Sequence, residues 1–119
     1  MPLLRNATTG TIVATRIDPL STFFQRAVGL LARTAMRPDE GVWIRRCGAI
    51  HTIGMRVPID VIFVDGDSRV MRTVADVPPN RLALSCRGAE AVVELGSGAL
   101  RECDVLPGDT LELVPGKFG

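Results

Sequence analysis

Hydrophobic and polar positions near the start of the chain predict one strand and one helix. A short β-branched run, Ile12–Ile17, alternates in part and predicts a first strand, which Asp18-Pro19 is expected to end. Apolar residues then recur at helical spacing after Ser21, which is a suitable N-cap residue, and they predict a helix over Thr22–Arg33.

From Val42 onward the pattern is that of short strands. Five runs rich in β-branched residues predict them: Val42–Ile44, Val57–Val64, Arg69–Val74, Glu90–Leu95 and Thr110–Val114. Asp65-Gly66-Asp67 has the composition of a hairpin turn between two of these strands, and one helical turn is expected over Ala99–Cys103. Many short strands with one early helix predict a mainly β fold, a small sandwich or barrel with one short N-terminal helix. The breaks are too short for linkers, so a single domain over residues 1–119 is expected.

Composition and charge exclude several classes of protein. The chain has 14 basic and 13 acidic residues, a formal charge of +1, and no basic run longer than Arg45-Arg46. Nucleic-acid binding normally needs a clustered basic excess, so no nucleic-acid partner is expected. No apolar stretch approaches the length of about 18 residues that crosses a membrane, and Met1–Gly10 lacks a signal-peptide pattern. We therefore expect no membrane association and a cytoplasmic location.

Cysteine usage agrees with that location. Cys47, Cys86 and Cys103 are widely spaced and odd in number. A disulfide framework favours even numbers, so reduced thiols are expected.

The order of several motifs resembles a known family. The motifs are Arg26–Leu31, Glu40-Gly41, Cys47–Asp60 continuing to Asp65, Val92–Leu95, Gly98 and Gly108-Asp109. Together they resemble domain-of-unknown-function family 192, also called UPF-0127, over roughly Thr11 to Val114, nearly the whole chain. The central motif resembles the subgroup that reads Cys…Ile-His-Thr-x-x-Met-Arg-x-Pro-Ile-Asp. Other members carry Trp-Met-Lys-Asn-Thr before Pro-Leu-Asp, and here His51 and Thr52 stand where that Trp-Met falls. The resemblance implies a compact β sandwich or barrel with a short N-terminal helix, and no established activity, substrate or cofactor.

Cys47 and His51 suggest either an activated thiol nucleophile or a pair of metal ligands. If Cys47–Met55 were one extended strand, the two residues would lie about 13 Å apart at about 3.3 Å per residue. The pair can therefore meet only if the chain bends, and Gly48 is the residue that makes a bend easy. The alternative is a buried cysteine beside a hydrogen-bonded histidine.

A metal site would need further ligands, and the residues available for that role have no diagnostic spacing: Asp60, Asp65, Cys86 and Cys103. We therefore predict no metal and no cofactor.

Pro58 and Asp60 lie at the entrance to an apolar run, Val61–Val64, which is expected to be buried on both faces. A proline belongs at a strand edge, a bulge or a strand start. The Asp60 carboxylate either accepts hydrogen bonds from backbone or from Arg56, or it serves as a general base or ligand contact. Met55 is interpreted as core-filling or as a pocket residue.

Three functions remain after these exclusions. The favoured one is binding of a small molecule or a protein partner in a pocket near five residues: Cys47, His51, Met55, Arg56 and Asp60. The alternative is a hydrolytic enzyme that depends on a thiol or on a His/Asp pair. A structural or interaction domain without a ligand is the third hypothesis.

Overall fold

The computed structural model describes residues 1–20 and 35–116. The helix predicted over Thr22–Arg33 lies outside these residues. In chain order, the described elements are β1 (Leu3–Asn6), β2 (Ile12–Ala14), β3 (Arg16–Leu20), β4 (Glu40–Arg45), β5 (Ala49–Ile50), β6 (Ile59–Val64), β7 (Val70–Val77), β8 (Leu84–Ser85), β9 (Ala91–Gly96), α2 (Ala99–Glu102) and β10 (Leu111–Val114).

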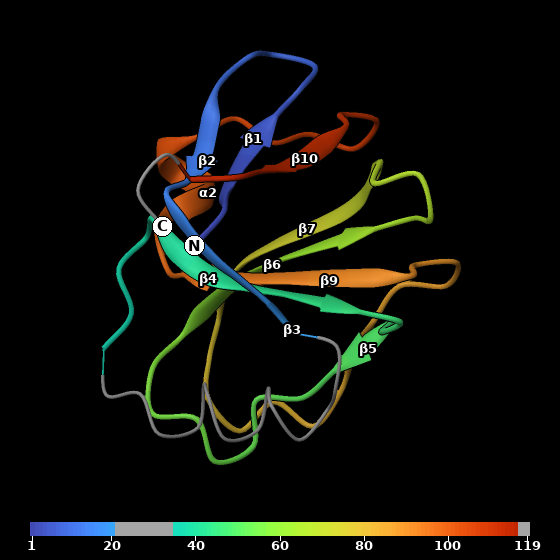
Figure 1. Ribbon diagram of the computed structural model, residues 1–119. Coiled ribbons are helices and arrows are strands. Elements are labelled where there is room, and N and C mark those ends of the chain that lie inside the picture. Colours follow the sequence, from blue (N-terminus) through green and yellow to red (C-terminus); the bar gives the residue numbers. More distant parts are fainter. Residues whose placement is uncertain (21–34, 117–119) are drawn as a thin grey trace.

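The strands form three sheets that do not close into one barrel (Figure 1). A five-stranded sheet has the order β3-β4-β9-β6-β7, and a three-stranded sheet has the order β10-β1-β2. β5 and β8 make a separate two-stranded ladder. All pairings are antiparallel except that of β3 with β4. The prediction of a mainly β fold is confirmed. The sequence left a sandwich and a barrel open, and the observed sheets are open and layered, as in a sandwich.

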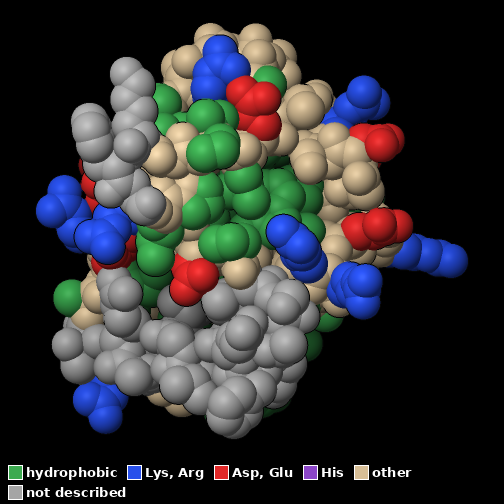
Figure 2. Space-filling view, in the orientation of Figure 1, with side chains coloured by type: hydrophobic (Ala, Val, Ile, Leu, Met, Phe, Trp, Pro, Cys, Tyr) green, Lys and Arg blue, Asp and Glu red, His purple; other side chains and the backbone are tan. Residues whose placement is uncertain are grey.

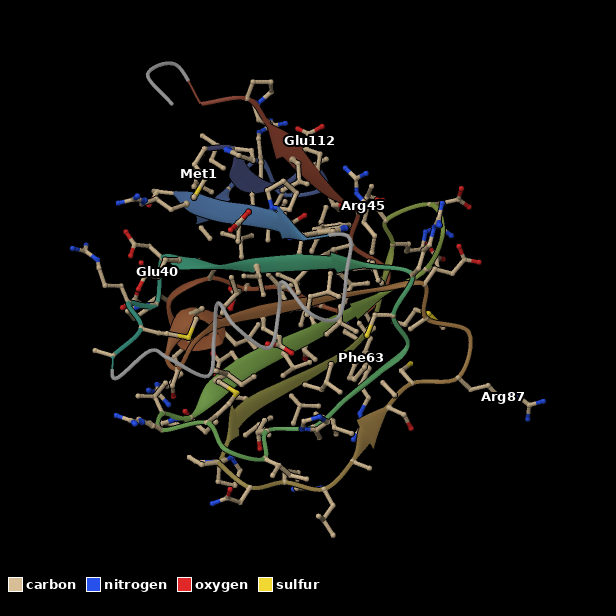
Figure 3. The ribbon with its side chains drawn as sticks, turned by 60° about the horizontal axis from the view of Figure 1, so that its bottom comes forward. Met1, Glu40, Arg45, Phe63, Arg87 and Glu112 are labelled. Carbon is tan, nitrogen blue, oxygen red and sulfur yellow. The ribbon has the colours of Figure 1, made fainter. Side chains whose placement is uncertain are left out.

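β6 and β9 form the centre of the molecule because all six residues of each are buried. A strand with packed neighbours on both faces needs a continuous apolar run, which confirms the interpretation of Val61–Val64. Val93 and Ile62 face a first core cluster shared with the three-stranded sheet. Phe63 and Val92 face a second cluster on the opposite side, which also receives Ile50 of β5. Figure 3 shows Phe63 in the interior and Arg87 projecting from the surface.

Figure 2 shows one face of the molecule, in the orientation of Figure 1. Hydrophobic side chains gather over the middle of that face, and charged side chains lie around them. No helix in residues 1–20 and 35–116 is long and apolar enough to cross a membrane.

The N-terminal strand prediction needs two corrections. The run Ile12–Ile17 is split at Thr15, whose amide donates to the Asp39 carbonyl oxygen at 2.9 Å, so β2 and β3 enter different sheets. The expected break at Asp18-Pro19 is wrong, because β3 continues through both residues and pairs Pro19 with Trp43. β3 is an edge strand, where a proline costs no ladder hydrogen bond on its outer side.

Most later elements were predicted with small errors at their ends. β6 begins at Ile59, directly after Pro58, which agrees with a proline at a strand start. β7 continues three residues beyond the predicted Val74, and the helical turn over Ala99–Cys103 is confirmed as α2. Sequence analysis missed β1, β5 and β8, which have four residues or fewer.

Gly41 allows β4 to pair closely with β9. A Cβ at this position would lie 2.0 Å from the Glu94 carbonyl oxygen, which is a backbone atom with no freedom to move aside. We expect Gly41→Ala to lower the free energy of unfolding by about 2 to 3 kcal/mol, measured by urea denaturation, because the added Cβ forces β4 away from β9.

The matched control is Gly66→Ala, whose Cβ would meet the Glu90 carboxylate at 2.9 Å, the movable end of a flexible side chain. This change should cost less than about 1 kcal/mol. Equal stability of the two variants would contradict the argument.

Candidate functional site

The Cys47–Asp60 segment is a bent loop and not one strand. It pairs with β8 only over β5, and a turn follows in which the Met55 amide donates to the Thr52 carbonyl oxygen at 3.1 Å. Gly54 in this turn has a φ of 82°, a left-handed conformation that glycine adopts without strain. The straight-strand geometry considered from the sequence therefore does not apply.

Thr52 fixes this loop to the neighbouring chain. Its side chain is almost fully buried, and its hydroxyl donates to the Pro78 carbonyl oxygen at 2.7 Å and accepts from the Arg81 amide at 2.8 Å. The Thr52 amide donates to the Arg81 carbonyl oxygen at 3.0 Å, and its carbonyl oxygen accepts from the Asn80 amide at 2.8 Å. Burial requires such complete satisfaction of polar groups. Thr52 thus sets the position of the adjacent, half-buried His51.

Asp60 is 0% exposed and accepts two backbone hydrogen bonds. Its Oδ1 accepts from the Asp76 amide at 2.9 Å, and its Oδ2 accepts from the Leu100 amide at 2.8 Å. Leu100 lies in the first turn of α2, where amides have no partner within the helix. The sequence left backbone and Arg56 open as partners, and the observed partners are backbone amides. The carboxylate therefore joins β6 to β7 and to α2.

Asp76 carries this network to the surface. The Ser97 hydroxyl donates to Oδ1 of Asp76, and Nη1 of Arg101 donates to Oδ2 at 2.7 Å. The Ser97 hydrogen bond, helped by the charge of Arg101 and opposed by partial loss of hydration, lowers the pKa of the Asp76 carboxyl below its usual 3.8. The Asp76 and Arg101 side chains are 49% and 66% exposed, so water screens this ion pair.

The other predicted residues occupy three different environments. Cys47 is half-buried, and its thiol donates to the Ala49 carbonyl oxygen at 3.0 Å. Met55 is buried in the second core cluster, as its core-filling interpretation predicted. Arg56 is exposed to solvent. The segment therefore spans core, loop and surface, and its side chains do not share one environment.

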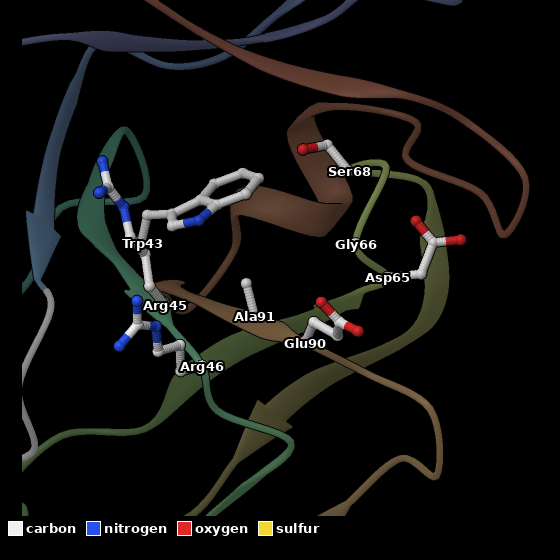
Figure 4. A pocket seen from close by; sticks show the side chains of 8 residues that line it. All are labelled: Trp43, Arg45, Arg46, Asp65, Gly66, Ser68, Glu90 and Ala91. Atoms are coloured by element: carbon white, nitrogen blue, oxygen red, sulfur yellow. The ribbon is translucent and has the colours of Figure 1, made fainter.

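A shallow cavity of about 260 Å³ lies at the end of β4 (Figure 4). The residues around it come from β4, from the β6–β7 hairpin and from the start of β9. They are Trp43, Arg45, Arg46, Asp65, Gly66, Ser68, Glu90 and Ala91.

The cavity has opposite charges on opposite sides. Figure 4 shows Arg45 and Arg46 on one side and Asp65 and Glu90 on the other, with the ring of Trp43 beside them. Trp43 is the only tryptophan of the chain, and it is mostly buried. Guanidinium groups bind carboxylates and phosphates, and carboxylates bind ammonium groups. This arrangement can therefore bind a molecule that carries both charges.

Three of these charged side chains are available to a ligand. Within the described part of the chain, no hydrogen bond or ion pair engages the side chains of Arg45, Arg46 or Glu90. Asp65 differs, because its Oδ1 accepts from the amides of Asp67 at 2.9 Å and Arg69 at 3.0 Å, which stabilises the hairpin turn.

Sequence analysis missed this cavity. Its residues come from three separate segments, and the sequence showed them only as a basic pair, Arg45-Arg46, a hairpin turn, Asp65-Gly66, and a strand start at Glu90. Their meeting depends on the pairing of β4 and β6 with β9 and on the bond from the Cys47 amide to the Glu90 carbonyl oxygen at 3.1 Å. No local pattern indicates such pairings.

Another feature that the sequence did not indicate is a second buried carboxyl group. Glu94 is fully buried on β9, on the side of the second core cluster by the alternation of a strand. Within residues 1–20 and 35–116, no group of three or more His, Cys, Asp or Glu side chains is placed to hold a metal ion.

The comparison with protein families gives one match over most of the chain. The model of the DUF192 family, described as "Uncharacterized ACR", matches residues 4–113. No curated protein matches the chain.

Two solved structures share the fold. A candidate transcription regulator from Sinorhizobium meliloti 1021 superposes with a TM-score of 0.79 at 25% identity, over 94% of this chain and 91% of that one. A protein of unknown function from Novosphingobium aromaticivorans DSM 12444 superposes with a TM-score of 0.77 at 28% identity, over 94% of this chain and 84% of that one.

The role of Asp60 can be tested by one atom exchange. Asp60→Asn keeps one oxygen acceptor but turns an NH₂ group toward the second amide, so we expect a loss of about 1 to 3 kcal/mol of unfolding free energy in urea. Asp67→Asn is the matched control, because that side chain is exposed. Equal effects of the two changes would show that the Asp60 bonds do not hold the fold.

Asp76 should make stability depend on pH in the acid range. Because the pKa of Asp76 is lowered on folding, its contribution is present above about pH 4 and is lost as pH falls through the lowered value. Asp76→Asn should therefore unfold at lower urea than wild type at pH 7, and this gap should narrow as the pH falls below about 4. Asn suits the φ of 53° at this position, so backbone strain is not changed. A gap that does not narrow as the pH falls would refute the prediction.

Proposed function

This chain belongs to the DUF192 family, and we propose that it is a binding domain for a small polar molecule with one negative and one positive group. The observation that carries the proposal is the cavity beside Trp43, which has Arg45 and Arg46 on one side and Asp65 and Glu90 on the other. The volume of about 260 Å³ lies just below the usual range for ligand pockets, roughly 300–1,000 Å³, and suits a compact metabolite better than a protein segment.

The Cys47–Asp60 segment takes part at its first residue. Cys47 follows Arg46, and its amide donates to the Glu90 carbonyl oxygen. The segment therefore connects the basic side of the cavity to its acidic side. Asp60 and Met55 support the segment from the core. Binding contacts at His51 and Arg56 stay predictions. The hydrolytic alternative lacks support from Asp60, whose two oxygens are already bonded to amides.

Two finer assignments accompany this proposal. We place the chain in the subgroup with the Cys…Ile-His-Thr-x-x-Met-Arg-x-Pro-Ile-Asp motif, which residues 47–60 match. We also propose a cytoplasmic location, because three widely spaced cysteines suit reduced thiols.

The Sinorhizobium meliloti relative is described as a candidate transcription regulator, which makes DNA the competing ligand. The charge of this chain argues for a small ligand instead. The formal charge is only +1, and the basic pair lines the same cavity as two carboxylates. Duplex DNA is therefore included below as a contrary outcome.

Trp43 provides a direct measurement, because the chain has one tryptophan and no tyrosine. We expect its fluorescence to change on titration with at least one member of a panel of α-amino acids and betaines. Acetate and methylammonium each satisfy one wall only, so they should bind more weakly. Arg46→Ala should weaken binding of that amino acid or betaine by about 10-fold or more, the usual effect of losing a charged hydrogen bond.

The matched control is Arg87→Ala, which removes an exposed arginine outside the cavity and should leave affinity unchanged. No response to any panel member, a ligand insensitive to both Arg45→Ala and Arg46→Ala, or a response only to duplex DNA would overturn the proposal.

A further inference from the structure

Cys47 and Cys86 lie at adjacent ends of the β5–β8 ladder. The register pairs Ala49 with Ser85, and the Cys86 amide donates to the Gly48 carbonyl oxygen at 3.1 Å. Gly48 therefore lies opposite Cys86 in a hydrogen-bonded pair, and Cys47 is one residue further along. A spacing of about 5.5 Å across the strands and about 3.4 Å along them gives a Cα separation of about 6.5 Å for the two cysteines. Disulfides span Cα separations of roughly 4.4–6.8 Å.

The two side chains also face the same side. Neighbouring positions in a regular ladder alternate, but here both cysteines pack against the second core cluster. The chain bends at Gly48, between Cys47 and the ladder, and this bend interrupts the alternation. Gly48 helps, since a Cβ there would lie 3.0 Å from the Ala89 carbonyl oxygen, and its absence lets the chain close onto the turn after Cys86.

Both thiols are accessible and separately bonded in the reduced protein. Each cysteine is half-buried and free. The Cys47 thiol donates to the Ala49 carbonyl oxygen at 3.0 Å, and the Cys86 thiol lies 4.0 Å from the Arg87 carbonyl oxygen. Thiols are weak hydrogen-bond donors, so a bridge would replace contacts that stabilise the protein little.

We propose that Cys47 and Cys86 are a dithiol site that low-molecular-weight disulfides oxidise to an intramolecular bridge. One cysteine thiolate attacks a sulfur of glutathione disulfide, and one glutathione thiolate leaves, so that a mixed disulfide forms. The second cysteine thiolate then attacks the protein sulfur of that bond, and the second glutathione leaves. The protein loses two protons and two electrons, and one glutathione disulfide becomes two glutathione molecules. Reversible bridges of this kind are the ones found in reducing compartments.

Cys103 is a built-in comparison. It lies on the other side of the molecule's core, where its thiol contacts the Ile12 and Val13 carbonyl oxygens at 3.4 and 3.7 Å. Burial, and then the charges of Glu102 and Asp104, raise the pKa of the Cys103 thiol, which lowers its thiolate fraction. It should therefore stay reduced while the other two cysteines react.

The test is oxidation of the folded full chain by glutathione disulfide, followed by peptide mass mapping without reduction. Cleavage at arginine and lysine separates the cysteines into residues 47–56, 82–87 and 102–117. We expect peptide 47–56 linked to peptide 82–87 at least 10-fold more often than any link to Cys103, in a protein of monomeric mass. Cys103→Ser should give the same linked pair.

Two outcomes would overturn the proposal. One is glutathione attached to Cys47 or Cys86 without the internal link. The other is the same set of links in folded protein and in protein oxidised in concentrated urea, where the chain imposes no register. Because the mapping uses the wild-type chain, it does not depend on whether Cys47→Ser or Cys86→Ser folds.

Discussion

The buried carboxylate of Asp60 is the interaction on which the other parts of the structure depend. Its two oxygens accept hydrogen bonds from Asp76 and Leu100, so one side chain of a central strand fixes an edge strand and a helix. A charge at full burial is tolerated only because both oxygens have partners. The positions of β7 and α2, and through Asp76 the surface contacts with Ser97 and Arg101, follow from this one group.

The elements that the sequence predicts well are those whose pattern is decided locally. β6 contains a continuous apolar run, Val61–Val64, so its burial on both faces was predicted, and β9 was predicted as a strand from its β-branched residues. The errors occur where tertiary contacts decide. Thr15 divides one β-branched run because Asp39 binds its amide, and Pro19 is tolerated because β3 has no strand beyond it among the described residues.

The candidate site shows the same division. The sequence predicted a binding pocket near the Cys47–Asp60 motif, yet the buried members of the motif have structural roles. Asp60 accepts hydrogen bonds from backbone amides, and Met55 fills the core. Thr52 anchors the loop through Pro78 and Arg81, residues that no spacing in the sequence connects to it. The cavity assembles charges from three segments, so it could be recognised only after the strand order was known.

Pro19 has a consequence for the behaviour of the protein at high concentration. Among residues 1–20 and 35–116, β3 forms one edge of the five-stranded sheet, and the Ile17 amide on that edge already donates to the Pro2 carbonyl oxygen at 2.9 Å. The remaining part of a sheet edge is a template on which strands of other molecules can add. At Pro19 an arriving strand finds no N–H group, so a continuous intermolecular ladder cannot form there. The residue that was expected to end a strand thus opposes edge-to-edge association between molecules and the growth of fibrils.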